Sequence, residues 1–143
     1  MRLRFLSGLL LFVAFMAGCG GEVVPPLAQV SGVLTDEAGT PLDGVKVMFL
    51  PDPEAENFGQ PSSGETDDQG KFTLYYDGNK QNPGAAVGKN RVILRDIKAT
   101  RSSRDETPMA RRFSEKYVTA NSTDLSFDVK NEAGQSFEIK VSK

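Results

Sequence analysis

The chain of 143 residues contains no histidine and a single cysteine, Cys19. Without histidine it cannot form a Ser–His–Asp triad or any other site that uses a histidine base. It also lacks paired carboxylates in a catalytic frame and a phosphate-binding glycine loop. One cysteine permits no disulfide within the chain, and zinc sites built from cysteine and histidine are excluded. We therefore expect no enzyme activity, no metal and no cofactor.

No apolar run is long enough to cross a bilayer as a helix. The run Leu9–Met16 has eight residues, whereas a spanning helix needs about 20. It follows two basic residues, Arg2 and Arg4, and is followed by small residues. This order of basic, apolar and small residues is typical of a secretory signal peptide. The sequence predicts such a peptide over residues 1–18.

The position of Cys19 makes this signal more specific. Met16-Ala17-Gly18-Cys19 resembles the lipobox of bacterial lipoproteins, although Met16 stands where that pattern usually has leucine. In that family the cysteine becomes the lipidated N-terminus after cleavage. The resemblance implies a membrane anchor at Cys19 and a location in the cell envelope. Gly20 favours the outer membrane, on its periplasmic side or at the cell surface.

The charge of the chain does not favour nucleic-acid binding. Removal of residues 1–18 lowers Lys+Arg from 17 to 15 against 19 Asp+Glu, so the net charge becomes 15 − 19 = −4. Residues 20–88 hold eleven acids and three bases, whereas residues 89–143 hold eight acids and twelve bases. We expect strands from the two halves to interleave in one fold, so that these charges largely cancel.

Short stretches of alternating apolar and polar residues dominate the chain after the prolines Pro25 and Pro26. These prolines and the lack of periodicity predict a flexible tether over residues 19–29. Alternation with period two is typical of strands with one buried face. It predicts seven short strands, over residues 30–35, 45–50, 89–96, 125–129 and 137–141 and on both sides of a turn within residues 64–76.

Two turns connect the strands that are best defined. Thr66-Asp67-Asp68-Gln69-Gly70 has the residues of a tight turn, with Gly70 in the left-handed conformation, and predicts a hairpin. Asn131–Gly134 separates the last two strands, which we expect to pair antiparallel because each has one apolar and one polar face. Strands joined by turns, without a long helix, indicate an all-β antiparallel sandwich over residues 30–143.

Two motifs resemble those of carboxypeptidase-regulatory-like domains. Gly39-Thr40-Pro41-Leu42-Asp43-Gly44-Val45 is similar to the opening motif of that family, and Thr66–Phe72 to its hairpin motif. Gly88–Leu94 resembles the next strand, with Asn90 in place of an aromatic residue. The resemblance implies a prealbumin-like or Ig-like sandwich without catalytic residues. Together with the lipobox it implies a short, single-domain bacterial lipoprotein.

The segment Ile97–Lys116 is long, polar and without period. Such loops in compact domains are usually functional or mobile. The functional interpretation is a basic loop that binds an acidic glycan, a lipid headgroup or a protein. The alternative is a mobile excursion that Phe113 and Tyr117 hold to the domain. The candidate partner-binding residues are Arg101, Arg104, Arg111 and Arg112.

These observations predict a non-catalytic, lipid-anchored module of the cell envelope that binds protein or glycan through its loops. Two alternatives remain. One is a structural protein that self-associates through its edge strands. The other is a hydrolase whose site contains Lys, Asp and Tyr but no histidine. The sequence predicts no nucleic-acid partner and does not determine the oligomeric state.

Overall fold

The computed structural model describes residues 24–54, 59–100 and 110–143. These ranges contain ten strands in three sheets, one short α-helix and one 3-10 helix. The strands are β1 (Leu27–Ala28), β2 (Val30–Asp36), β3 (Val45–Pro51), β4 (Ser62–Glu65), β5 (Lys71–Thr73), β6 (Tyr75–Tyr76), β7 (Ala85–Ala86), β8 (Gly88–Asp96), β9 (Ser126–Val129) and β10 (Gln135–Val141); the helices are α1 (Ile97–Thr100) and η1 (Glu115–Val118).

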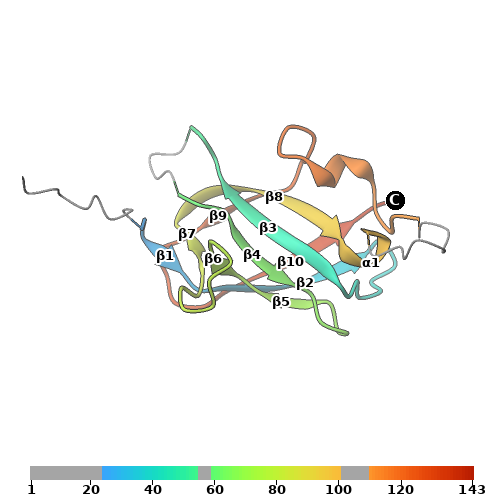
Figure 1. The fold of residues 1–143 in the computed structure, drawn as a ribbon, viewed down its shortest axis with the longest axis horizontal. Helices are drawn as coiled ribbons and strands as arrows, with labels where there is room; N and C mark the ends of the chain where they lie inside the picture. The colour runs from blue at the N-terminus through green and yellow to red at the C-terminus, as the bar shows by residue number, and fades with distance from the viewer. Residues whose placement is uncertain (1–23, 55–58, 101–109) are drawn as a thin grey trace, which may run out of the picture.

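Two larger sheets form the all-β sandwich that the sequence predicts. The five-stranded sheet has the order β6-β4-β3-β8-β9, and the three-stranded sheet has the order β10-β2-β5. Strands β1 and β7 pair at one end of the molecule, and α1 lies at the other end (Figure 1). Three of the ten strands have only two residues each. The remaining seven correspond to the seven strands that were expected.

The core lies between the two larger sheets. On β3, Val45, Val47 and Phe49 are fully buried, as the alternation predicts. The Phe49 ring packs against Phe127 at 5.9 Å and against Phe137 at 6.0 Å between ring centroids. Because Phe127 comes from β9 and Phe137 from β10, this aromatic cluster joins the two sheets. Burial of these side chains is the main favourable term in folding.

The turn at residues 66–70 is confirmed, but the hairpin is wrong. The Asp67 carboxylate accepts the N–H groups of Gln69 and Lys71, at 2.9 and 2.8 Å. Gly70 has φ +71°, as the turn requires. However, β4 pairs with β3 and β6 in the five-stranded sheet, whereas β5 pairs with β2 in the three-stranded sheet. The turn therefore carries the chain from one sheet to the other.

The predicted pairing of the last two strands is also wrong. Strand β9 pairs antiparallel with β8, and β10 pairs parallel with β2, so they belong to different sheets. Phe137 lies beside Gly32 in this parallel pair. A Cβ on Gly32 would lie 2.4 Å from the Phe137 carbonyl oxygen and 2.5 Å from the Phe72 ring. Glycine at this position allows both β10 and Phe72 to approach β2.

The ordered domain begins earlier than residue 30. Ala28, within the range expected to be tether, is 5% exposed and belongs to the hydrophobic core. It lies in β1, which pairs with Ala85 and Ala86 of β7. Small apolar side chains on both strands permit this close packing at the end of the sandwich. Among the described residues, no helix has the length and apolar character needed to cross a membrane.

Candidate functional site

Of the five candidate site residues that the sequence predicts, the structure describes only Arg111 and Arg112. Cys19, Arg101 and Arg104 lie outside the described ranges. Arg111 and Arg112 are adjacent in sequence but differ in environment. Among the described residues, the Arg111 guanidinium forms an ion pair with Glu115 alone, at 2.9 Å, and the Glu115 side chain is 90% exposed. The Arg112 side chain is only 24% exposed because it enters an acidic cluster at the end of the sandwich.

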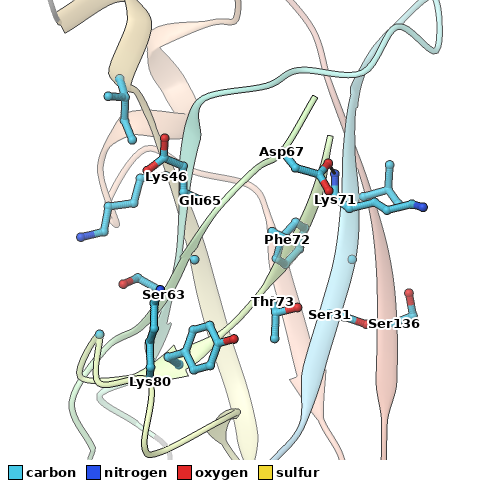
Figure 2. Close-up of a pocket in the computed structure, with 16 residues that line it drawn as sticks. Ser31, Lys46, Ser63, Glu65, Asp67, Lys71, Phe72, Thr73, Lys80 and Ser136 are labelled. Atoms are coloured by element: carbon cyan, nitrogen blue, oxygen red, sulfur yellow. Dashed lines mark hydrogen bonds between the residues drawn. The ribbon is translucent and has the colours of Figure 1, made fainter. Parts of the chain in front are cut away.

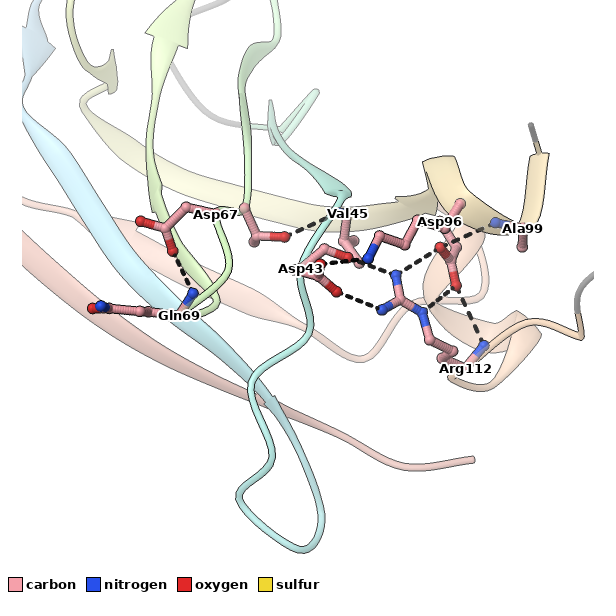
Figure 3. A network of polar contacts seen from close by, with 9 residues as sticks. Asp43, Val45, Asp67, Gln69, Asp96, Ala99 and Arg112 are labelled. Carbon is pink, nitrogen blue, oxygen red and sulfur yellow. Dashed lines mark hydrogen bonds and ion pairs between the residues drawn. The ribbon is translucent and has the colours of Figure 1, made fainter.

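Arg112 bridges two aspartates from distant parts of the chain (Figure 3). Its Nη2 and Nε donate to the two carboxylate oxygens of Asp96, at 2.8 and 3.0 Å. Its Nη1 and Nη2 also donate to Asp43, at 3.1 Å to the carboxylate and 2.7 Å to the carbonyl oxygen. Lys98 forms a second ion pair with Asp43. We call Asp43, Asp96, Lys98 and Arg112 the Arg112 cluster.

The Arg112 cluster shifts the ionisation of its members. Burial alone would raise the pKa of Asp96, but hydrogen bonds from Arg112 and Ala99 and the guanidinium charge hold it below its ordinary value. Hydrogen bonds from Lys98 and Arg112 likewise lower the pKa of Asp43. The hydrogen bond to Asp96 raises the pKa of Arg112. Asp43, Asp96 and Arg112 are therefore charged at neutral pH.

The Arg112 cluster holds the chain after residue 109 against the sandwich. Asp96 ends β8, Asp43 precedes β3, and Arg112 begins the segment that leads to η1. Phe113 and Tyr117 follow and are 3% and 4% exposed. The expected anchoring by these two rings is confirmed. Because its donors face Asp96 and Asp43, Arg112 has a structural role here, and partner binding by any of the four arginines stays a prediction.

A groove crosses the edge where β4 and β5 diverge (Figure 2). Its volume is about 1010 Å³. Side chains from both sheets line it: Ser63 and Glu65 lie on one side, and Thr73 and Ser31 on the other. The two strands pass very close here, since a Cβ on Gly64 would lie 2.1 Å from the Thr73 carbonyl oxygen. Glycine at residue 64 thus permits the crossing that forms the groove.

The groove presents hydroxyl groups and lysines that have no acidic partner. Lys46, Lys71 and Lys80 line it, and none of them makes an ion pair with a described residue. The carboxylate of Asp67 also lines it but is bound to the turn. Tyr75 adds an aromatic side chain. Sequence reasoning identified the outward alternation of these residues but had no sign that the two strands face a shared groove.

No known family model matches the chain, and no curated protein matches it in sequence. A solved structure of a DUF3823 family protein from Parabacteroides merdae is similar, with a TM-score of 0.45 and 14% identity. The likeness covers 82% of this chain and 46% of that protein, so this chain spans less than half of that protein's length. The resemblance to carboxypeptidase-regulatory-like domains and to lipoproteins therefore stays a prediction.

Proposed function

We propose that this chain is a non-catalytic module of the cell envelope, anchored by lipid at Cys19, that binds a protein or glycan. The lipobox-like sequence supports the anchor, and the absence of histidine from the whole chain supports a binding role. The proposal places the mature chain on the periplasmic side of the outer membrane or at the cell surface.

The groove between β4 and β5 is the observation that carries the binding proposal. A binding site requires polar groups that converge on accessible space and are not already satisfied by the protein. Lys71 and Lys80 provide cations that form no ion pair with any residue in the described ranges, and Ser63 and Thr73 provide hydroxyl groups. Hydroxyl and ammonium groups can hydrogen-bond the hydroxyls and carboxylates of a glycan or the backbone of a peptide. The rigid sandwich holds these groups in place.

Capture from native envelopes tests the groove. The lipidated protein is compared with a variant that combines Lys71→Glu and Lys80→Glu. A control variant combines Lys140→Glu and Lys143→Glu, which change the net charge equally outside the groove. We expect the groove variant to lose a protein or glycan that the control retains. Equal recovery by all three proteins would contradict binding in the groove.

The basic loop and the anchor need separate variants. Arg101→Glu, Arg104→Glu and Arg111→Glu together test the loop and leave the Arg112 cluster intact. Loss of the captured partner would place binding in the loop. Cys19→Ser should abolish lipid incorporation and release the protein from membranes or leave its precursor unprocessed. A Cys19→Ser protein that still carries lipid would contradict the anchor.

Self-association is a second candidate function because β10 is an edge strand of seven residues. Ser114 and Tyr117 form hydrogen bonds with Ser142, which directly follows the strand. No described segment pairs with the outer side of Ser136, Glu138 and Lys140. Unpaired edges can pair with another chain. Sedimentation of residues 20–143 over a range of concentrations tests this; a monomer at all concentrations would contradict it.

A further inference from the structure

The outer face of the five-stranded sheet carries apolar side chains between cations. The inward residues of β3 and β8 alternate with outward ones. The strand register places these outward residues side by side in three rows. We call this surface the β3–β8 face; its rows are Lys46 beside Arg95, Met48 beside Ile93, and Leu50 beside Arg91.

The first row places two like charges opposite each other. Directly opposed like charges destabilise a sheet. Neither Lys46 nor Arg95 forms an ion pair with a described residue. Glu65 lies beside Lys46 on its other side, but no ion pair joins them. The fold therefore carries an unrelieved repulsion at its surface, which an external anion would convert into attraction.

Further cations extend along β8. Lys89 is exposed and without an ion pair in the described ranges, and Arg91 is 3.6 Å from Asp52. Lys89 and Arg95 are six residues apart on one strand, which corresponds to about 20 Å at about 3.3 Å per residue. The mature chain is acidic, with a net charge of −4 (15 − 19). Unpaired cations along one face of an acidic protein indicate attraction to an extended anionic surface.

The middle row supplies an apolar strip. Met48 and Ile93 are partly exposed, and with Val118 they line a groove of about 780 Å³. Arg95 and Arg111 line the same groove. Apolar side chains flanked by Lys and Arg are typical of surfaces that lie in the headgroup region of a membrane. A small soluble anion would meet one end of the strip only, whereas a bilayer surface meets both ends at once.

We infer that the β3–β8 face docks on a membrane surface that contains anionic phospholipid. Lys46, Lys89 and Arg95 face the headgroups, and the apolar strip enters the interface. The inference deepens the proposed function, because lipidation at Cys19 would keep the domain near the bilayer. The eight residue-to-residue steps from Cys19 to Leu27 could span at most about 29 Å if fully extended. Docking on the anchoring membrane is then effectively intramolecular.

Vesicle binding without the lipid anchor tests docking independently of Cys19. Residues 20–143 contain every described element of the fold. They are mixed with vesicles of phosphatidylcholine, with or without phosphatidylglycerol. We expect binding to the anionic vesicles that weakens as salt is added. Each cation near an anionic membrane strengthens binding about fivefold, so Lys89→Gln combined with Arg95→Gln should weaken it about 25-fold.

A control variant separates docking from net charge. Lys140 lies on β10 of the three-stranded sheet and Lys143 follows that strand, and both are exposed. Lys140→Gln combined with Lys143→Gln changes the net charge equally and should leave vesicle binding within about twofold, because these cations are outside the β3–β8 face. Equal losses in both variants would overturn the inference, as would equal binding to neutral and anionic vesicles. A Cys19→Ser protein that still carries lipid would overturn the anchor and leave this result unaffected.

Fluorescence gives a second readout that reports orientation. The chain contains no tryptophan, so a single introduced indole has no background. Ile93→Trp places the probe in the apolar strip, and Val33→Trp places it on the outer side of β2. We expect anionic vesicles to shift the emission of the first probe to shorter wavelength and leave the second unchanged. A shift in both probes, or in neither, would overturn the assigned face.

Discussion

Replacement of Arg112 by methionine should destabilise the domain far more than the same change at Arg111. Arg112→Met retains a long apolar side chain but removes every guanidinium donor from the Arg112 cluster, whereas Lys98 keeps its ion pair with Asp43. The Asp96 carboxylate is 0% exposed and would lose its ion pair with Arg112. Within the described part of the chain, Arg111 pairs only with the exposed Glu115. Arg111→Met is therefore a matched control with the same chemical change one residue away.

The expected magnitude follows from the contacts of Asp96. Removal of one partner from a buried ion pair typically costs about 3–5 kcal/mol. Two features reduce this value: Arg112 is 24% exposed, and Asp96 keeps a hydrogen bond from the Ala99 N–H. We expect Arg112→Met to lower the free energy of unfolding by about 2–3 kcal/mol. An exposed pair contributes about 0–1 kcal/mol, so Arg111→Met should change it by less than about 0.5 kcal/mol.

Urea unfolding of residues 20–143 measures both changes. A third variant, Asp96→Leu combined with Arg112→Met, should be less destabilised than Arg112→Met alone, because it removes both partners of the buried ion pair together. Equal stability of Arg112→Met and the unchanged protein would refute the structural role given to the cluster. So would equal losses for Arg111→Met and Arg112→Met.

The same variants should differ in their dependence on pH. The pKa of Asp96 lies below its ordinary value in the folded protein. This contribution to stability is complete above the unfolded-state pKa of about 3.9 and is lost as the pH falls through the lower folded-state pKa. In Arg112→Met, the hydrogen bonds and the charge of Arg112 no longer lower the pKa of Asp96 against the effect of burial, so Asp96 protonates at a higher pH than in the unchanged protein. The stability difference should be constant near neutral pH and shrink below about pH 5.

Three further substitutions test other features of the fold. Thr66→Val should cost about 1–3 kcal/mol, because the Thr66 hydroxyl accepts the buried Val45 N–H at 2.9 Å; Thr66→Ser keeps that acceptor, and a similar loss in both would contradict this. Gly64→Ala should cost about 1–3 kcal/mol by the same urea assay, since its Cβ would lie 2.1 Å from the Thr73 carbonyl oxygen; an unchanged midpoint would refute the close crossing. Lys46→Gln should stabilise the sheet at low salt by about 0.2–1 kcal/mol through relief of the like-charge row, and a loss of stability would contradict that repulsion.

The local pattern predicted the direction of side chains well. Alternation on β3 identified Val45, Val47 and Phe49 as inward, and all three are fully buried. The turn chemistry of Asp67 and Gly70 also predicted the observed conformation. Both predictions depend on neighbours within a few residues, because strand period and turn geometry are local properties of the backbone.

The alternation of apolar and polar residues could not identify the β3–β8 face or the Arg112 cluster, because both depend on contacts between distant parts of the chain. Lys46 and Arg95 are far apart in sequence, and only the pairing of β3 with β8 places them side by side. Arg112 was grouped with the other arginines of its loop as a cation for a partner. The structure instead gives Arg112 a structural role, because it forms ion pairs with Asp43 and Asp96 at the end of the sandwich. Charge in a sequence does not reveal whether a counter-charge lies nearby.

The sequence by itself determined where the seven longer strands lie, which of their faces are apolar and where the chain turns between them, but it did not predict the short strands β1, β6 and β7. Tertiary structure alone decided which strands pair. The turns after β4 and β9 both lead to the opposite sheet, where Phe72 and Phe137 complete a core that also contains Phe49. Alternation of apolar and polar residues is the same whether two consecutive strands pair as a hairpin or belong to opposite sheets. The choice depends on close approach at Gly32 and Gly64 and on burial of rings from distant strands, which no local pattern contains.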